Sequence, residues 1–300
     1  MFKHILVPLD GSKLAEAILP AAISLAEMLH APVTLLHVIE QDASTEVHND
    51  HHLTRPAEAQ EYLDKICQTV FPASVKVDTH IHSAPVSDVS GSIIEHATSE
   101  FQPDLILLCS HGKGGMRNLI FGSIAQQVAA AGGIPVMLIK PGQAASSFRI
   151  SRILVPLDNE SIHDLALPYA EVLSKAYQAR LDMLCVIPTL VTDSGAHAAA
   201  GTMLPVTAAA YLDITEEIAE EHFQEHLDEF EKKGIPATAE IVRGDPASMI
   251  IKEAERLESN LILLGTHGRA GLDAFWNRSV TAGVAMKTNI PLLLIPLSDL

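Results

Sequence analysis

The sequence contains an internal repeat that spans almost the whole chain. The segment Lys3–Asp10 reads KHILVPLD and returns as SRILVPLD at Ser151–Asp158, 148 positions later. The segment Asp104–Gly112 reads DLILLCSHG and returns as NLILLGTHG at Asn260–Gly268, 156 positions later. Self-similarity of this kind indicates a duplicated structural unit. We therefore expect two homologous modules in tandem.

The boundary between the two copies lies in Pro141–Arg149, a stretch of Pro, Gly, Ser and Ala that is typical of a linker. We expect domains at residues 1–142 and 149–300, joined by a linker at 143–148. The second copy carries a net insertion, which we place in the Ala- and Thr-rich stretch Val191–Ala210.

Composition excludes several classes of protein. The 300 residues include 20 Lys and Arg against 37 Asp and Glu, which gives a net charge of −17. Nucleic-acid-binding proteins usually carry a basic surface, so this composition argues against that class. The apolar runs are far shorter than the roughly 20 residues of a membrane helix, and Pro8 and Asp10 interrupt the apolar N-terminus, so no secretory signal is visible. Three scattered cysteines indicate a reduced setting without a disulfide framework. We expect a soluble, cytoplasmic protein without a membrane partner.

Within the first copy, short apolar runs alternate with amphipathic segments. The expected strands are His4–Leu9, Val33–Ile39, Val75–His82, Leu105–Cys109 and Val136–Ile139, and the expected helices are Ala15–Leu29, Ala57–Val70, Ser92–Ser99 and Ser123–Ala131. Continuous apolar strands separated by helices predict a parallel sheet covered on both faces. Crossover handedness then favours an open, doubly wound α/β fold.

In such a sheet, ligands bind outside the carboxyl ends of the strands, where the strand order reverses. The turns after the first and fourth strands, Asp10–Ser12 and Ser110–Gly115, are polar and rich in glycine, and Gly122 and Ser123 open the next helix. Small residues at a helix N-terminus let backbone N–H groups approach an anion, and Asp10 could accept hydrogen bonds from a ribose. The pattern indicates a phosphate-bearing ligand, in particular a nucleotide. A glycine-rich turn that only reverses the direction of the chain, without binding a ligand, would have a similar sequence.

These motifs resemble the universal stress protein family, and the resemblance covers both copies nearly end to end. It implies a tandem universal stress protein in which each domain is a Rossmann-like, five-stranded parallel sheet. One branch of this family binds ATP through Gly-x2-Gly-x9-Gly-Ser/Thr, with an Asp after the first strand on the ribose and a Val at the end of the second strand on the adenine. By position, these are Asp10 and Val38 in the first copy and Asp158 and Val186 in the second.

Neither copy matches the ATP signature fully. The first copy has Cys109 in place of the first Gly, where a side chain could crowd the ribose, and the second copy has Arg278 in place of the phosphate-side Gly. Arg278 either fills the pocket or binds a phosphate directly. The first copy is the better ATP site. The resemblance and the turns together give as candidate nucleotide-binding residues Pro8, Asp10, Val38, Cys109, His111, Gly112, Gly122, Ser123 and Ile124, and Asp158, Val186, Gly265, Gly268, Arg278 and Ser279.

A histidine cluster offers an alternative, metal-binding role. His48, His51 and His52 lie within five positions, and on a helix the spacings i, i+3 and i+4 share one face. Imidazoles are common Zn²⁺ ligands, although solvated polar residues are also ordinary in a loop. His80 and His82 share a strand face, which is more typical of surface histidines.

Another histidine pair stands in a predicted acidic helix, Glu216–Lys233. The string from His222 to His226 matches the His-x-x-Glu-His pattern of some zinc peptidases, but nothing else of a peptidase surrounds it. We assign it no peptidase function.

The resemblance implies a regulatory protein with at most slow ATP hydrolysis, because no catalytic pair and no lysine-containing phosphate loop is evident in the sequence. Bound ATP, with Mg²⁺, would order the loop Lys113–Phe121 and change a surface that a protein partner sees. The resemblance also implies pairing of the last strands, Val136–Ile139 and Leu292–Ile295, in an internal pseudo-dimer, and two chains could form a homodimer. The rival readings are an interaction scaffold with degenerate sites and a metal- or redox-responsive module that uses the histidine cluster or Cys109.

Overall fold

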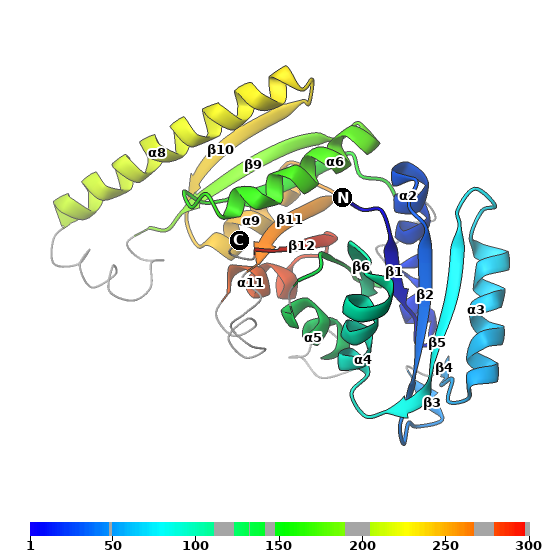
Figure 1. Ribbon diagram of the computed structural model, residues 1–300. Coiled ribbons are helices and arrows are strands. Elements are labelled where there is room, and N and C mark those ends of the chain that lie inside the picture. Colours follow the sequence, from blue (N-terminus) through cyan, green and yellow to red (C-terminus); the bar gives the residue numbers. More distant parts are fainter. Residues whose placement is uncertain are drawn as a thin grey trace. The chain divides into compact units, whose positions relative to one another are not determined.

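The computed structural model describes residues 1–47, 50–110, 123–131, 133–141, 148–189, 205–266 and 279–297 (Figure 1). These residues form two compact units. The first takes the described residues up to Arg149 together with the last strand, β12 (Leu292–Pro296). The second takes Ile150–Thr266 and the described residues of the segment that ends at Ile290.

The first unit is built on a mostly parallel sheet whose central strands are buried. Its strands are β1 (Ile5–Pro8), β2 (Val33–Glu40), β5 (Val77–Val86), β6 (Leu105–Cys109) and β7 (Val136–Ile139). They pair in the parallel order β7-β6-β1-β2-β5. On the far side of β7, β12 adds an antiparallel strand, with Leu293 opposite Met137. The predicted strands and the α/β class are confirmed.

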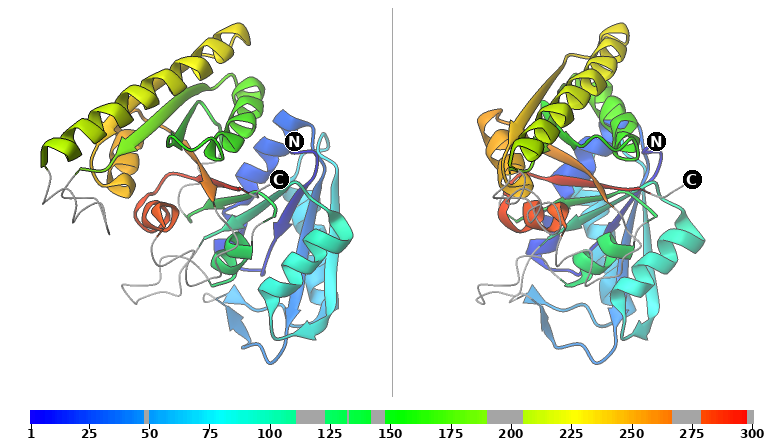
Figure 2. Two further views of the ribbon diagram at one scale, coloured as in Figure 1. Left: turned by 60° about the vertical axis from the view of Figure 1, so that its left-hand side comes forward. Right: turned by 90° about the vertical axis from the view of Figure 1, so that its left-hand side faces the viewer.

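Helices cover both faces of this sheet. They are α1 (Lys13–Glu16), α2 (Leu19–Leu29), α3 (Pro56–Val70), α4 (Val89–Glu95), a π-helical turn η1 (His96–Phe101) and α5 (Ser123–Ala131). In the views of Figures 1 and 2, α3 lies against β5 and β2, and α4 packs with α5 away from it. A two-stranded hairpin, β3 (Glu46–Val47) and β4 (Asp50–His51), precedes α3.

One predicted helix of the first unit is divided in two. The sequence pattern predicts a single helix over Ala15–Leu29, but α1 ends at Glu16 and α2 begins at Leu19. Pro20 explains the break, because proline has no N–H for the helix ladder and its ring clashes with the carbonyl four residues earlier, that of Glu16.

The second unit repeats the arrangement. Its strands are β8 (Arg152–Leu157), β9 (Arg180–Ile187), β10 (Ala237–Arg243) and β11 (Leu261–Thr266), in the parallel order β10-β9-β8-β11. Its helices are the 3-10 turn η2 (His163–Ala166), α6 (Leu167–Tyr177), α8 (Pro205–Lys232), α9 (Pro246–Arg256) and α11 (Val280–Lys287). The helix predicted at Glu216–Lys233 is thus the second half of α8. The insertion predicted at Val191–Ala210 lies outside the described residues up to position 204, and its last residues begin α8. None of the described helices combines the length and the apolar character that crossing a bilayer requires.

Candidate functional site

The strand order of the first unit reverses between β1 and β6. The chain proceeds outward from β1 to β2 and β5, then returns to β6 and continues to β7. Asp10 follows the end of β1, and Cys109 is the last residue of β6. Parallel strands place their carboxyl ends at one edge, and ligands of open α/β sheets bind at such a reversal. The two predicted site residues therefore belong to the same edge.

Asp10 is oriented by its own turn. The backbone N and the Oγ of Ser12 donate to Asp10 Oδ1 over 2.9 and 2.7 Å. Ser12 Oγ in turn accepts from the N–H of Ala15 at the start of α1. Gly11 makes this turn with φ +89°, and a Cβ there would lie 2.7 Å from Leu53 Cδ1. The carboxylate is fixed by a turn that only glycine accommodates well.

Cys109 is an inert thiol beside this carboxylate. Its side chain is 8% exposed, and burial, with a further contribution from the charge of Asp10, raises the pKa of the thiol to about 12. The thiol is therefore protonated at neutral pH, and a protonated thiol is a poor nucleophile. The next residue, Ser110, is also buried, and its N–H donates to Ile139 O over 2.7 Å.

The end of β2 lies beside the same edge. Pro8 pairs with Leu36, and Val38 is buried opposite His82 of β5. Next to Val38, His37 is 1% exposed, and its Nδ1 and Nε2 lie 2.8 and 3.0 Å from the carbonyl oxygens of Leu9 and Leu53. Sequence reasoning missed His37 as a residue that ties the end of β1 to the loop before α3. A histidine within a largely apolar strand was the available signal.

The remaining predicted residues of the first copy are placed only in part. Ser123 and Ile124 are exposed in the first turn of α5. His111, Gly112 and Gly122 lie outside the described residues, as do Gly268 and Arg278 of the second copy.

The second copy presents its aspartate differently. Asp158 Oδ1 accepts hydrogen bonds from the N–H of Glu160 over 2.9 Å and from His163 Nδ1 over 2.7 Å. Burial raises the pKa of Asp158, but the bonds from His163 and Glu160 outweigh it, so the pKa lies below its ordinary value, and the carboxylate raises the pKa of His163. In the first copy, Ala15 stands at the position of His163.

The other described residues of the second copy occupy the expected element ends. Val186 lies in β9 opposite Val242, and Gly265 lies in β11 one residue before its end. Ser279 caps α11, because its Oγ accepts from the N–H of Ala282 over 3.1 Å.

The structure does not bring His51 and His52 into one ligand set, and His48 lies outside the described residues. His51 belongs to a strand of the hairpin rather than to a helix, and neighbouring residues of an extended chain point to opposite sides. His51 Nε2 lies 3.6 Å from Glu58, whereas the buried ring of His52 contacts the Ser44 carbonyl over 3.1 Å.

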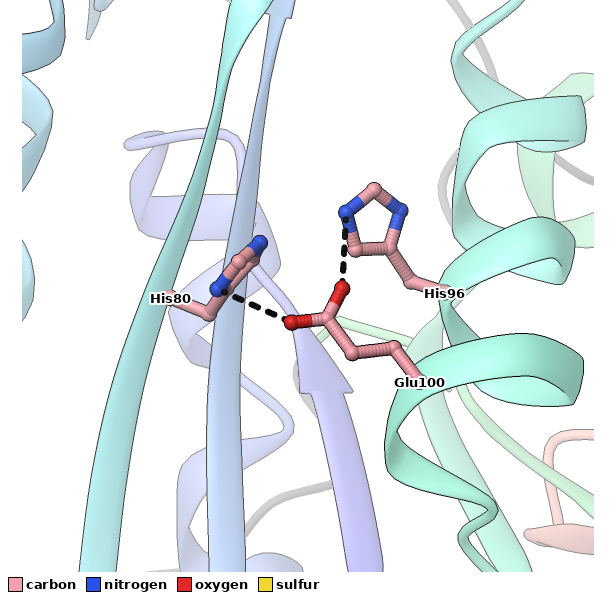
Figure 3. Close-up of side chains that lie close together, drawn as sticks. All are labelled: His80, His96 and Glu100. Atoms are coloured by element: carbon pink, nitrogen blue, oxygen red, sulfur yellow. Dashed lines mark ion pairs between the residues drawn. The ribbon is translucent and has the colours of Figure 1, made fainter.

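A different histidine group gathers between β5 and η1 (Figure 3). His80 Nδ1 lies 3.8 Å from one oxygen of Glu100, and His96 Nε2 lies 3.6 Å from the other. The second nitrogen of His96, Nδ1, donates to Ser92 O over 2.8 Å. His82 completes the group, with its ring centroid 4.9 Å from that of His96. Burial lowers the pKa of His80.

A second group in the described residues joins η2 to α8. His222 Nε2 lies 2.9 Å from Asp164 Oδ2, and His226 Nε2 lies 3.4 Å from Asp164 Oδ1. The three residues could supply imidazole and carboxylate ligands to a metal ion.

Comparison with known proteins agrees with this architecture. The model of the universal stress protein family matches residues 1–140 and 149–296. A universal stress protein of Mycobacterium tuberculosis is 20% identical over 302 residues, which cover 96% of this chain and 95% of that protein. One from Methanocaldococcus jannaschii is 26% identical over 149 residues, 47% of this chain and 83% of that protein. The crystal structure of a universal stress protein from Archaeoglobus fulgidus aligns over 99% of this chain and 97% of its own, with a TM-score of 0.71 and 21% identity, and shows the same fold.

Proposed function

The chain belongs to the universal stress protein family, and on that premise we propose that it is a stress-response regulator that binds ATP in its first copy. The nucleotide binds at the carboxyl edge of β1 and β6 and controls what the protein contacts, rather than serving as the substrate of a dedicated enzyme. The family matches support the proposed division into domains at 1–142 and 149–300.

One observation carries the proposal. Asp10 follows β1 and Cys109 ends β6, so two residues almost a hundred positions apart in the sequence lie at the same carboxyl edge, where the strand order reverses. An aspartate fixed by Ser12 suits hydroxyl donors such as those of ribose. Because the buried thiol of Cys109 is neutral, it does not repel a negatively charged phosphate group of a ligand.

We assign binding to the first copy because an ionisable histidine holds the carboxylate of the second copy, whereas Ser12 holds that of Asp10 through neutral hydrogen bonds. Asp158 already accepts a hydrogen bond from His163, and a ribose hydroxyl would have to compete with that charged bond. The second copy then serves as the structural half. In the first copy, bound ATP with Mg²⁺ orders the loop Lys113–Phe121, and that loop is the surface presented to a protein partner.

Calorimetric titration of the full chain with ATP and Mg²⁺ tests this function, together with analysis of nucleotide in the protein as purified. We expect one ATP per chain, a loss of at least about tenfold in affinity in Asp10→Asn, and unchanged affinity in the matched variant Asp158→Asn. Absence of both binding and co-purified nucleotide would overturn the proposal. Loss of binding in Asp158→Asn alone would move the site to the second copy.

A further inference from the structure

Three side chains of the second unit converge from two elements. His222 and His226 are four positions apart on α8 and therefore share one helix face. The Nε2 atoms of both rings face the carboxylate of Asp164 in η2, over 2.9 and 3.4 Å, and lie 3.0 Å from each other. The side chains are 17–22% exposed, so an ion has access from solvent.

The arrangement contains more acceptors than protein donors can satisfy. If His222 Nε2 carries the proton that it donates to Asp164 Oδ2, it has no lone pair left to accept a hydrogen bond from His226 Nε2, 3.0 Å away. Asp164 Oδ1 is buried and accepts no hydrogen bond, although His226 lies close to it. Buried polar atoms without partners are rare in folded proteins. A cation placed among the three would engage a lone pair of each.

We propose that Asp164, His222 and His226 bind one divalent transition-metal ion of the zinc class. Zn²⁺ takes imidazole nitrogen and carboxylate oxygen at about 2.0–2.2 Å, which places tetrahedral ligand atoms about 3.3–3.5 Å apart. The two Nε2 atoms lie 3.0 Å apart, and they lie 2.9 and 3.4 Å from the two different oxygens of the Asp164 carboxylate, so small adjustments bring one carboxylate oxygen and both nitrogens to these separations. Three protein ligands leave a fourth position for water or for a ligand from a partner.

The first copy supplies an internal comparison. The buried residues Ala59 and Leu63 of α3 correspond to the buried Ala219 and Phe223 of α8. On this alignment, His222 stands where the first copy has Tyr62, and His226 stands where it has Ile66.

Asp164 stands where the first copy has Glu16. Tyr62 OH in α3 donates to Glu16 in α1 over 3.4 Å. The first copy therefore has a side-chain contact between α1 and α3 that corresponds to the one between η2 and α8 in the second copy. Only the second copy has a set of metal-binding side chains at that contact, so the proposed site is specific to the second copy.

The group in Figure 3 is the natural competitor within the described residues. His80 and His96 approach Glu100 only to 3.8 and 3.6 Å, and Glu100 is about half exposed, so its carboxylate is held less firmly. Because the side chains around Asp164 lie closer together, we expect a metal ion to bind there before it binds at His80, His96 and Glu100.

The test is metal binding by the full chain after removal of metal with a chelator. ZnCl₂ is titrated in competition with a chromophoric chelator, and CoCl₂ is used to record the visible absorption of a four- or five-coordinate ion. We expect one ion per chain at the tight site. The double variant H222Y/H226I, which installs the residues of the first copy, is expected to weaken the zinc dissociation constant by at least about 100-fold and to abolish the cobalt band.

Two further variants keep the result interpretable. Asp164→Asn preserves the shape of the side chain and is expected to weaken zinc binding by at least about tenfold, while circular dichroism in chelator checks that each variant is folded. His80→Gln is the matched control and is expected to bind within about twofold of the parent. Zinc binding that persists in H222Y/H226I, that disappears in His80→Gln, or that is absent from the parent chain would overturn the proposal.

Discussion

His163 donates a hydrogen bond from Nδ1 to Asp158 Oδ1 over 2.7 Å, at a position where the first copy has Ala15. The two copies therefore share an aspartate after their first strand but not its surroundings. In the first copy Ser12 holds the carboxylate through neutral hydrogen bonds, whereas in the second an imidazole forms an ion pair with it. The carboxylate of the first copy is thus held by a neutral side chain, and that of the second copy by an ionisable one.

The ion pair predicts a pH dependence of stability. The pKa of His163 is raised in the fold, so its contribution is complete below its unfolded value of about 6.5 and is lost as the pH rises through the higher folded value. The pKa of Asp158 is lowered, so its contribution is lost as the pH falls through a value below 3.8. His163→Gln should therefore destabilise the protein between about pH 4 and 6.5, and the effect should shrink as the pH rises through the raised pKa of His163.

The size of this effect is modest, about 0.2–1 kcal/mol, because the side chain of Asp158 is 53% exposed. Urea unfolding at pH 5.5 and at pH 8.5 measures it. An equal loss at both values would show that the contact does not depend on the charge of His163.

Gly11 is expected to be intolerant of a side chain. A Cβ there would meet Leu53 Cδ1 at 2.7 Å in a backbone with φ +89°. Gly11→Ala should cost about 1–3 kcal/mol of unfolding free energy, from backbone strain and overpacking together. The matched control is Gly133→Ala, with φ +97° and nothing within 4 Å of the added Cβ, which isolates the strain. Equal losses in the two variants would show that contact with Leu53 contributes nothing.

A buried ion pair in the second unit predicts strong coupling between two positions. Asp182 is 2% exposed and accepts hydrogen bonds from Arg152 Nε over 2.5 Å and from Thr238 Oγ1 over 2.6 Å. Asp182→Thr should cost about 1.5–3 kcal/mol, because Arg152, which is 29% exposed, then loses its charge-assisted hydrogen bonds.

The first copy provides the compensating change for this pair. It has His4 and Thr34 at these positions, joined by a hydrogen bond of 2.8 Å between Nε2 and Oγ1. The double variant R152H/D182T should therefore recover at least about 1 kcal/mol relative to Asp182→Thr in urea unfolding. Strictly additive losses would refute the coupling.

The three cysteines should differ in reactivity. Burial raises the pKa of Cys109 to about 12 and that of Cys185 to about 11, each with a contribution from a nearby aspartate, whereas Cys67 is partly exposed. Iodoacetamide at pH 8 should modify Cys67 first and reach the other two only after unfolding, as read by mass spectrometry of peptides. Rapid modification of Cys109 in the folded protein would instead favour a redox role for that thiol.

The pattern of apolar and polar residues along the chain predicted most of the strands. Strands such as Leu105–Cys109 and Val136–Ile139 are found at the predicted bounds, because an unbroken apolar run flanked by polar turns has few other ways to bury itself. The placement of Asp10 and Cys109 at one edge also followed from the sequence, because the strand–helix alternation and the handedness of crossovers fix which strand ends meet. The break before α2 was missed, although Pro20 was its visible cause.

The sequence by itself determined the duplication, the alternation of strands and helices, and the edge of the sheet where a ligand would bind, since each depends on periodicity or on general rules of chain connection. Only the tertiary structure decided which side chains meet across long separations. The spacing of His222 and His226 is readable on a helix, but Asp164 lies 58 positions before His222 and reaches it only because η2 comes close to α8. Likewise, His51 lies in a strand of the hairpin and near Glu58, whereas His52 follows the strand and contacts the Ser44 carbonyl. Side-chain convergence depends on packing between elements, and no local pattern encodes that packing.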